Sequence, residues 1–432
     1  MVEQRVSLPL SASEIKAHTY MNFETISVVG LGYIGLPTAA MFAARRKKVI
    51  GVDVNQHAVD TINRGEIHIV EPDLDMLVHA AVSQGYLRAT TTPEPADAFL
   101  IAVPTPFSEG HKPDLLFVEA ASRAVAPVLK KGDLVVLEST SPVGATAKMA
   151  EWMAQLRPDL TFPQETGEMS DIRIAHCPER VLPGHVVREL VDNDRVIGGM
   201  TQRCSEAARE LYGLFVRGES IVTDARTAEM CKLTENSFRD VNIAFANELS
   251  LICDRLDINV WELIRLANRH PRVNILQPGP GVGGHCIAVD PWFIVDSAPE
   301  QARLIRAARE VNDGKPLWVI ERVERAAKRF REPVVACLGL AFKANIDDLR
   351  ESPSVEIVKE LAQRFPGCVV AVEPNIRSLP MELEGQISLC DLRTAVSEAD
   401  VIVILVDHAQ FRSVDPIRLQ TKVVIDTRGV FA

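Results

Sequence analysis

The chain has 432 residues, 47% of them hydrophobic, and this predicts two or three domains with hydrophobic cores. A formal net charge of -11 with no long basic run argues against nucleic acid as a partner. Eight cysteines without C-x-x-C spacing are typical of a reduced cytoplasmic protein and argue against a metal site. No apolar run approaches the ~18 residues that cross a bilayer, so we expect a soluble protein without membrane contact.

Residues 1–20 precede the first predicted element. They carry no secretory signal, because no charged region is followed by an apolar one. A second methionine, Met21, stands directly before the first strand pattern. We therefore expect residues 1–20 to form a mobile N-terminal extension.

A glycine-rich turn follows the first predicted strand, the β-branched run at 25–29. The sequence GLGYIG then leads into an alanine-rich stretch that favours a helix. Gly30 permits a tight turn, Gly32 lets a pyrophosphate approach the backbone, and Gly35 lets helix and strand pack closely. The pattern predicts a dinucleotide site with its phosphates at the helix N-terminus. The expected cofactor-binding residues of this turn are Gly30, Gly32, Tyr33, Ile34 and Gly35.

An acidic residue ends the second predicted strand, at 48–52. Asp53 lies close to the ~20-residue offset expected for the acid that binds a ribose 2′-hydroxyl. A carboxylate at this position would repel a 2′-phosphate. The predicted cofactor is therefore NAD and not NADP.

Two further predicted strands end in hydroxyl-bearing turns. Residues 98–103 run into Pro104 and Thr105, and residues 134–137 run into the segment that contains Thr140. Ligands of open α/β sheets bind beyond the carboxyl ends of the strands, so these residues are candidate cofactor contacts. Ordinary turn chemistry explains either threonine alone equally well.

A short strand at Ile174–Ala175 leads into the sequence HCPER, which contains Glu179. A carboxylate that follows a strand and a proline is a candidate general base. An exposed loop acid is the simpler alternative, and sequence spacing does not decide between the two.

A long helix is predicted over 227–256, because this segment lacks glycine and proline and repeats apolar residues at helical spacing. Such a helix usually buries its apolar stripe against a partner, so we expect a homodimer. Lys232 and Asn236 share one face. They form either a solvated face or, beside a reacting centre, an oxyanion clamp and a proton carrier. Asn259 and Glu262 then predict a capping box for a second helix.

The segment 278–290, PGPGVGGHCIAVD, is typical of a site rather than of a core element. Its glycines remove side chains next to Cys286, so that a substrate can approach the thiol closely. A cysteine without such context is more often a small buried hydrophobe. Here Asp290 follows four residues later, and we predict that Cys286 is the nucleophile of covalent catalysis.

A second pattern of strand, glycine and helix begins at 334–338, and buried-strand runs follow at 369–372 and 401–405. Alternating strands and helices predict a second doubly wound sheet. This sheet lacks the dinucleotide fingerprint, but Lys343 and Arg350 flank its first turn and suit phosphate charge. Single basic residues are otherwise usually solvated.

The chain carries, in order, the motifs GLGYIGLP, VPTP, ESTSPVG, CPERVLPG, AEMCKLTEN, GPGVGGHCIAVDP and GLAFKANIDDLRESP. Through them it resembles the nucleotide-sugar 6-dehydrogenase family over 21–432. The resemblance implies NAD-dependent oxidation of the C6 alcohol of a UDP-sugar to a carboxylate, in two steps. CPERVLPG and GGHCIAVDP are similar to the branch that acts on UDP-N-acetylhexosamines. The expected substrate is UDP-N-acetyl-D-mannosamine, and the expected destination is a bacterial surface polysaccharide such as enterobacterial common antigen.

The resemblance also implies catalytic roles. Cys286 would capture the aldehyde as a thiohemiacetal and then form a thioester, which Glu179 would help to hydrolyse. Lys232 would stabilise oxyanions and share proton transfer, and Asn236 would position the substrate. Asp290 would set local charge or orient water.

Further residues match the family at the cofactor and substrate sites. Thr140 would hold water or cofactor near the reacting carbon, and Arg272 would reach across a dimer interface. The substrate-binding residues implied by the resemblance are Glu179, Arg180, Val181, Leu182, Lys232, Asn236, Arg272, Gly283, Lys343 and Arg350.

The predicted fold class is α/β, with two doubly wound Rossmann-like domains joined by a central long-helix domain. We expect an NAD-binding domain over 21–210, a central dimerisation domain with the cysteine loop over 211–312, and a UDP-sugar-binding domain over 313–432. Three alternatives stay open. They are a UDP-glucose or UDP-N-acetylglucosamine 6-dehydrogenase, a catalytically silent sensor of NAD and nucleotide sugars, and a simple hydroxy-acid dehydrogenase, which explains neither the cysteine loop nor the second sheet.

Overall fold

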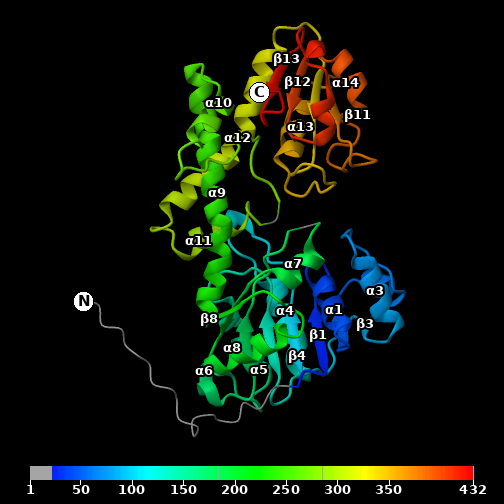
Figure 1. Ribbon diagram of the computed structural model, residues 1–432, viewed down its shortest axis with the longest axis vertical. Helices are drawn as coiled ribbons and strands as arrows, with labels where there is room; N and C mark the ends of the chain where they lie inside the picture. Colours follow the sequence, from blue (N-terminus) through cyan, green and yellow to red (C-terminus); the bar gives the residue numbers. More distant parts are fainter. Residues whose placement is uncertain (1–21, 183, 285, 432) are drawn as a thin grey trace, which may run out of the picture. The chain divides into compact units, whose positions relative to one another are not determined.

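The computed structural model describes residues 22–182, 184–284 and 286–431 (Figure 1). The predicted extension at 1–20 lies outside these residues. Within the described ranges, no helix is long and apolar enough to cross a membrane. The chain forms two compact units. Within the described ranges, unit 1 comprises the residues from 22 to Thr105, Leu115–Ser139 and Val143–Glu229, and unit 2 comprises Pro106–Asp114, Thr140–Pro142 and the residues from Met230 to 431.

Unit 1 is built on an eight-stranded sheet with the order β3-β2-β1-β4-β5-β6-β7-β8. Neighbouring strands are parallel from β3 through β6, whereas β7 runs antiparallel to β6 and β8 runs parallel to β7. The first six strands have the order of a dinucleotide-binding sheet. The strands are β1 Thr25–Val29, β2 Lys48–Val52, β3 Leu87–Thr90, β4 Ala98–Ile101, β5 Leu134–Leu137, β6 Arg173–His176, β7 Arg195–Gly199 and β8 Ser220–Asp224.

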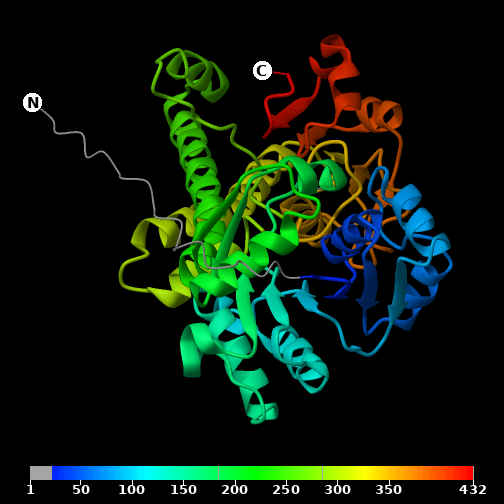
Figure 2. The same ribbon diagram turned by 60° about the horizontal axis from the view of Figure 1, so that its bottom comes forward.

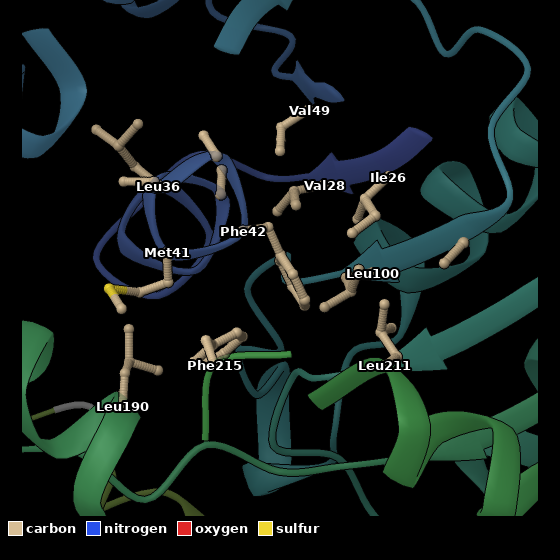
Figure 3. Close-up of a cluster of buried hydrophobic side chains, with 14 of the residues drawn as sticks. Ile26, Val28, Leu36, Met41, Phe42, Val49, Leu100, Leu190, Leu211 and Phe215 are labelled. Carbon is tan, nitrogen blue, oxygen red and sulfur yellow. The ribbon is translucent and has the colours of Figure 1, made fainter. Parts of the chain in front are cut away.

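Helices cover both faces of this sheet, and the alternation of side chains along each strand explains the two cores. Val28 and Leu100 enter one cluster with residues of α1, α3, α7 and α8, whereas Val29 and Ile101 enter another with residues of α4 and α5. Figure 3 shows the first cluster, where the rings of Phe42 and Phe215 meet edge to face at a centroid distance of 4.8 Å. The helices are α1 Gly35–Ala44, α2 Gln56–Asn63, α3 Leu74–Ser83, α4 Leu116–Val125, α5 Ala145–Leu156, α6 Pro163–Thr166, α7 Val186–Asp192 and α8 Gln202–Tyr212.

Unit 2 contains most of the long helix α9, Ala225–Leu256, which has 32 residues and is continuous in Figure 2. This confirms the helix predicted over 227–256. The Asn259 carboxamide accepts hydrogen bonds from the backbone of Trp261 and Glu262, so the predicted N-cap of the next helix is also present. The remaining helices are α10 Val260–Ala267, α11 Asp290–Ser297, α12 Arg303–Ala327, α13 Pro353–Arg364 and α14 Leu392–Glu398.

The second sheet lies wholly in unit 2, is parallel throughout and has the order β11-β10-β9-β12-β13. Its strands also divide their side chains between two cores, one against α12 and α13 and the other against α14. The predicted fold class, α/β with two doubly wound sheets, is confirmed. The strands are β9 Val335–Leu338, β10 Val369–Val372, β11 Ser388–Leu389, β12 Val401–Ile404 and β13 Val423–Asp426.

Candidate active site

The glycine turn after β1 has the steric features of a dinucleotide cradle. Gly30 has a φ of 91°, and a Cβ there would lie 2.5 Å from the Ala102 carbonyl oxygen. A Cβ on Gly35 would lie 1.8 Å from the Gly30 oxygen. At Gly32, in contrast, an added Cβ would meet no atom within 4 Å. The first and third glycines are therefore required by the fold, whereas the second leaves open space beside the backbone.

Asp53 lies beside this turn. Its carboxylate accepts hydrogen bonds of 2.9 Å from the backbone N–H groups of Leu31 and Asn55. The carboxylate is thus fixed where an acid suits a ribose hydroxyl and opposes a 2′-phosphate. Tyr33 is exposed and Ile34 is half-buried at the start of α1. The cradle and the acid together fit NAD.

The strand-end residues Pro104, Thr105 and Thr140 are the next predicted cofactor contacts, and each is described within its own unit. Pro104 is exposed, and Thr105 beside it has a buried hydroxyl without a hydrogen-bond partner among the described residues. A hydroxyl in this condition is suited to a ligand contact. Thr140 is half-buried and follows β5. It belongs to unit 2, whereas Thr105 belongs to unit 1.

Glu179 is buried after β6, with 7% of its surface exposed, so the alternative of an exposed loop acid is wrong. The backbone N–H of Arg180 donates to one carboxylate oxygen at 2.6 Å. The guanidinium of Arg195 lies 2.9 Å from the other oxygen. Arg195 escaped the sequence analysis because its strand, β7, was not predicted: RVIGG contains two glycines and lacks a clear apolar run.

The buried carboxylate of Glu71 binds the loop that follows Glu179. Glu71 accepts hydrogen bonds from the backbone of Gly184 at 2.9 Å and Val186 at 2.8 Å. Val181 packs against the core of unit 1, while the Leu182 side chain is exposed. Of these two predicted substrate-binding residues, therefore, only Leu182 has an exposed side chain, at 38%.

Asp290 and Asn236 come together in unit 2, although 54 residues separate them in the sequence. The Asn236 amide on α9 donates to the Asp290 carboxylate at the start of α11, and both residues are buried. The carbonyl of Cys286 accepts the backbone N–H of Asp290 at 2.9 Å, which places the thiol-bearing residue one turn before this helix. Because Asn236 is 6% exposed, the alternative of a solvated face is wrong for this residue.

The charged groups around Cys286 have opposite effects on the pKa of its thiol. Cys286 is exposed, but the protein atoms that surround its thiol raise the pKa, and the Asp290 carboxylate raises it further. Lys232, Arg350 and Arg239 act in the opposite direction. Burial also raises the pKa of Asp290 to about 7, against the effects of Asn236 and Lys232. Protonation of Asp290 near neutral pH therefore changes the charge that the thiol experiences.

The glycines of the cysteine loop have a packing role that the sequence analysis did not predict. We expected them to clear space for a substrate beside the thiol. In the structure a Cβ on Gly283 would lie 2.4 Å from the Glu351 carbonyl oxygen, and one on Gly281 would lie 2.8 Å from the Pro353 Cβ. These two glycines therefore permit close packing of the loop against Glu351 and against Pro353, the first residue of α13. That they also clear space for a substrate stays a prediction.

A buried polar network, which the sequence analysis missed, holds the start of the cysteine loop. Asn247 on α9 accepts the backbone N–H of Gly279 at 2.8 Å and donates to Asn312 on α12 at 2.8 Å. Asn312 in turn donates to Asp240 at 2.7 Å, and Arg309 also binds this carboxylate at 2.6 Å. The available signal was Asp240 and Asn247, two polar residues seven apart on a long helix, hence on one face.

Three of the basic residues predicted for the substrate, Arg272, Lys343 and Arg350, are exposed in unit 2, whereas Arg180 in unit 1 and Lys232 in unit 2 are half-buried. Lys343 is exposed, and Arg350 forms an ion pair of 2.6 Å with Asp348. Arg350 lies near enough to lower the pKa of Cys286, so it shares an electrostatic environment with the thiol. Arg272 is exposed in the segment after α10.

The second sheet has its own acid at the turn that corresponds to the dinucleotide cradle. Glu373, after β10, accepts backbone hydrogen bonds from Leu340 at 2.8 Å and Ala341 at 3.1 Å. His408 lies 2.9 Å from the same carboxylate and is fully buried. Hydrogen bonds within the protein therefore connect the backbone of this turn, Glu373 and His408. The sequence analysis did not predict this feature.

Three family models match the chain in succession. The NAD binding domain of the UDP-glucose/GDP-mannose dehydrogenase family matches residues 24–216. The central domain of the same family matches residues 226–314. Its UDP binding domain matches residues 336–432.

Characterised relatives cover almost the entire chain. It is 72% identical to an NDP-N-acetyl-D-galactosaminuronic acid dehydrogenase of Ralstonia nicotianae, over 95% of this chain and 97% of the relative. It is 66% identical to the UDP-N-acetyl-D-mannosamine dehydrogenase of Escherichia coli, over 95% of this chain and 100% of the relative.

Solved structures agree with these matches. A UDP-N-acetyl-D-mannosamine dehydrogenase from Pyrococcus horikoshii is 40% identical, with a TM-score of 0.85 and coverage of 94% of this chain and 96% of that one. The enzyme Cap5O from Staphylococcus aureus, a UDP-N-acetyl-mannosamine dehydrogenase, is 43% identical, with a TM-score of 0.81 and coverage of 94% and 95%.

Proposed function

The chain belongs to the UDP-glucose/GDP-mannose dehydrogenase family, and from this premise we propose that it oxidises UDP-N-acetyl-D-mannosamine to UDP-N-acetyl-D-mannosaminuronate. The protein is an NAD-dependent dehydrogenase, as its family and its relatives are. The observation that carries the proposal is the grouping around Cys286: a thiol, a buried Asp290 with a bonded Asn236, and nearby cationic charge. This grouping suits covalent capture of an aldehyde.

The proposed reaction removes four electrons from C6 in two oxidations. When bound, NAD accepts the hydride that leaves C6 in each of them. The alcohol first loses a hydride and a proton to give an aldehyde. The Cys286 sulfur then adds to the aldehyde carbon, forming a C–S bond, and the resulting thiohemiacetal loses a second hydride and proton to give a thioester. Water then cleaves the C–S bond, releasing the carboxylate and restoring the thiol.

The residues of unit 2 have proposed roles in the capture step. Lys232 holds the oxyanion that develops on C6 and shares its proton transfer. Asn236 positions the substrate, while Asp290, with a pKa of about 7, accepts or returns a proton close to physiological pH. An enzyme that uses such a carboxylate changes its activity with pH in the neutral range.

Two residues have proposed roles in hydrolysis. We assign Glu179 as the base that takes a proton from the attacking water, because its carboxylate is buried, with one oxygen bonded to a backbone N–H and the other beside the Arg195 guanidinium. Thr140 orients water or cofactor through its hydroxyl. The silent-sensor alternative does not account for this combination of a thiol, two buried acids and a lysine.

The cofactor contacts follow from the cradle. We propose that Gly30, Gly32 and Gly35 receive the pyrophosphate on backbone N–H groups and that Asp53 binds a ribose hydroxyl. The other proposed cofactor contacts are Tyr33, Ile34, Pro104, Thr105 and Thr140. The proposed substrate contacts are Arg180, Val181, Leu182, Arg272, Gly283, Lys343 and Arg350.

We propose a homodimer formed along α9. Four large apolar residues on one face of this helix are exposed: Phe238, Phe245, Ile252 and Leu256, at 69%, 53%, 44% and 59%. Their spacing of seven, seven and four residues forms one stripe, which is typical of an interaction surface. The described cysteines are all free, in keeping with a proposed location in the reducing cytoplasm.

A second substrate is favoured by one observation, the 72% identity to an enzyme named for N-acetyl-D-galactosaminuronic acid. The test is NADH production by the purified protein with UDP-N-acetyl-D-mannosamine, UDP-N-acetyl-D-galactosamine, UDP-N-acetyl-D-glucosamine and UDP-glucose. We expect the highest kcat/KM with the mannosamine compound and two NADH per sugar consumed. A higher kcat/KM with another sugar would make that sugar the assigned substrate. One NADH per sugar would contradict the four-electron reaction.

A further inference from the structure

Glu179 has a single charged partner within 4 Å among the described residues, and that partner is Arg195. The Nη2 atom of Arg195 lies 2.9 Å from Oε2 of Glu179, with 4% and 7% of the two side chains exposed. The two residues come from adjacent antiparallel strands, since Glu179 follows β6 and Arg195 opens β7. An ion pair this buried is costly to desolvate, so its geometry must be well supported.

The surroundings of Arg195 provide that support. Its guanidinium stacks 4.7 Å from the ring centroid of Tyr212, and its Nη2 reaches the Leu190 carbonyl at 3.5 Å. The Tyr212 hydroxyl donates to Oε1 of Glu138 at 2.8 Å, and Nη1 of Arg195 lies 4.0 Å from the same oxygen. Arg195 is thus fixed between two buried carboxylates by an aromatic ring and a carbonyl.

The carboxyl groups of Glu138 and Glu179 both interact with the positive charge of Arg195. Burial raises the pKa of Glu138 to about 7, Arg195 opposes this change, and Glu179 adds to it. Burial alone would favour a neutral Arg195, but the charge of Glu179 keeps its pKa above the usual value. Besides these groups, Tyr212 and the thiol of Cys177 face the cluster. At neutral pH Arg195 remains charged and Glu138 is the member that titrates.

We propose that Arg195 is a positioning residue that fixes the Glu179 carboxylate for thioester hydrolysis, and that Glu138 and Tyr212 fix Arg195. The inference rests on the proposed function, which assigns hydrolysis to Glu179. A base must present one lone pair to water in a narrow range of directions, and the buried guanidinium of Arg195 attracts one of the two oxygens of this carboxylate from 2.9 Å. The two oxidation steps do not require this base, so the effect is specific to hydrolysis.

The test separates hydrolysis from oxidation in the full-length protein. Arg195→Lys keeps the charge but loses the planar fork. Arg173→Lys is the matched control, because Arg173 is a half-buried arginine on β6 whose guanidinium donates to the Gly132 carbonyl. Each variant is mixed with UDP-N-acetyl-D-mannosamine and NAD, the early NADH burst and the steady rate are recorded, and acid-quenched protein is weighed by mass spectrometry.

We expect Arg195→Lys to retain a burst of about two NADH per site while its steady rate falls roughly 10- to 100-fold. The quenched protein should carry the sugar acyl group on Cys286, and Arg173→Lys should resemble the wild type. A parallel fall of burst and steady rate without an adduct would overturn the inference, since a merely structural role predicts that result. If Arg195→Lys does not fold, Tyr212→Phe carries the test, because it keeps the ring and removes only the hydroxyl bonded to Glu138. A steady rate equal to wild type in Tyr212→Phe would then overturn the inference.

Glu179→Gln distinguishes this inference from the proposed function. If Glu179→Gln accumulates the adduct and Arg195→Lys does not, Arg195 has no positioning role and the assignment of Glu179 stands. If neither accumulates it while the wild type still forms two NADH per sugar, the role of Glu179 in hydrolysis is wrong and the inference falls with it.

Discussion

The side-chain amide of Asn236 donates a hydrogen bond to the buried carboxylate of Asp290. The bond joins the middle of α9 to the first residue of α11, just after the loop that carries Cys286. It is the only direct side-chain hydrogen bond to Asp290 among the described residues, and it opposes the rise in pKa that burial causes. A buried carboxylate with a pKa near 7 is suited to proton transfer, but its burial does not stabilise the fold at neutral pH.

Asp290→Asn should therefore stabilise the protein above neutral pH while reducing its activity. The pKa of Asp290 is about 7 in the folded state and near 3.8 when unfolded. Because the folded value is raised, the wild type loses stability as pH rises from about 4 to about 7, and the loss remains above that range. At about 1.4 kcal/mol per pKa unit, it is at most on the order of 4 kcal/mol.

The measurement is the melting temperature of both proteins at pH 5 and pH 8. We expect Asp290→Asn to melt higher than the wild type at pH 8 and to differ much less at pH 5. A difference that does not change with pH would show that Asp290 does not titrate in this range. The fall in turnover, expected to be 100-fold or more, follows from loss of the proton carrier.

Asn247→Ala should increase the mobility of the cysteine loop, because it removes a buried hydrogen bond to the start of that loop. The substitution removes the partner of the buried Gly279 N–H and of the Asn312 side-chain oxygen, at a cost of about 1–3 kcal/mol. Its matched control is Asn242→Ala on the same helix. Among the residues that the structure describes, the Asn242 amide donates only to the Phe238 carbonyl, in an exposed hydrogen bond.

Hydrogen exchange of the backbone at residues 279–284, compared between the two variants, checks this prediction. Faster exchange in Asn247→Ala than in Asn242→Ala, together with a lower kcat, is the expected outcome. Equal exchange in both variants would mean that the polar network does not hold the loop.

Much of the fold followed from the sequence because its elements repeat simple patterns. The strands at 25–29, 48–52 and 134–137 are continuous apolar or β-branched runs, and they agree with β1, β2 and β5. The strands β3 and β8 were missed because they lie at the two edges of the sheet, where β3 alternates buried with more exposed residues and β8 contains only half-buried and exposed residues. Their short, half-polar sequences do not differ from loops.

The polar partners within the site could not be predicted for a different reason. Arg195 meets Glu179, and Asn247 meets Gly279, through contacts between segments that are distant in sequence. Nothing in the local spacing of one chain specifies such pairs, whereas burial makes them obligatory once the fold forms. The glycines near Cys286 illustrate the same point, since their packing partners lie at and just before the start of α13.

Asp53→Asn should relax the choice between NAD and NADP. The asparagine keeps an oxygen for the N–H of Leu31 or Asn55 but removes the charge that would repel a 2′-phosphate. We expect the ratio of kcat/KM for NAD to that for NADP to fall 10-fold or more. Steady-state kinetics with both cofactors measure it, and an unchanged ratio would exclude Asp53 as the discriminating acid.

Arg272 tests the proposal of a shared dimer site. Arg272 is exposed in this chain, so Arg272→Ala should fold normally and lose activity. Mixing it with Cys286→Ala under conditions of subunit exchange should restore roughly a quarter of the wild-type activity, because half of random dimers hold one complete site. If the mixture stays inactive while subunits exchange, Arg272 does not act across the interface.

The central claim is that the sulfur of Cys286 bonds to C6 of the sugar between the two oxidations. The most direct measurement is mass spectrometry of the peptide containing Cys286, taken from wild-type and Cys286→Ser enzyme quenched during turnover. We predict a sugar adduct on the wild-type peptide, and neither an adduct nor uronate from Cys286→Ser, although this variant still binds NAD. Uronate formation at the wild-type rate by Cys286→Ser would contradict the account.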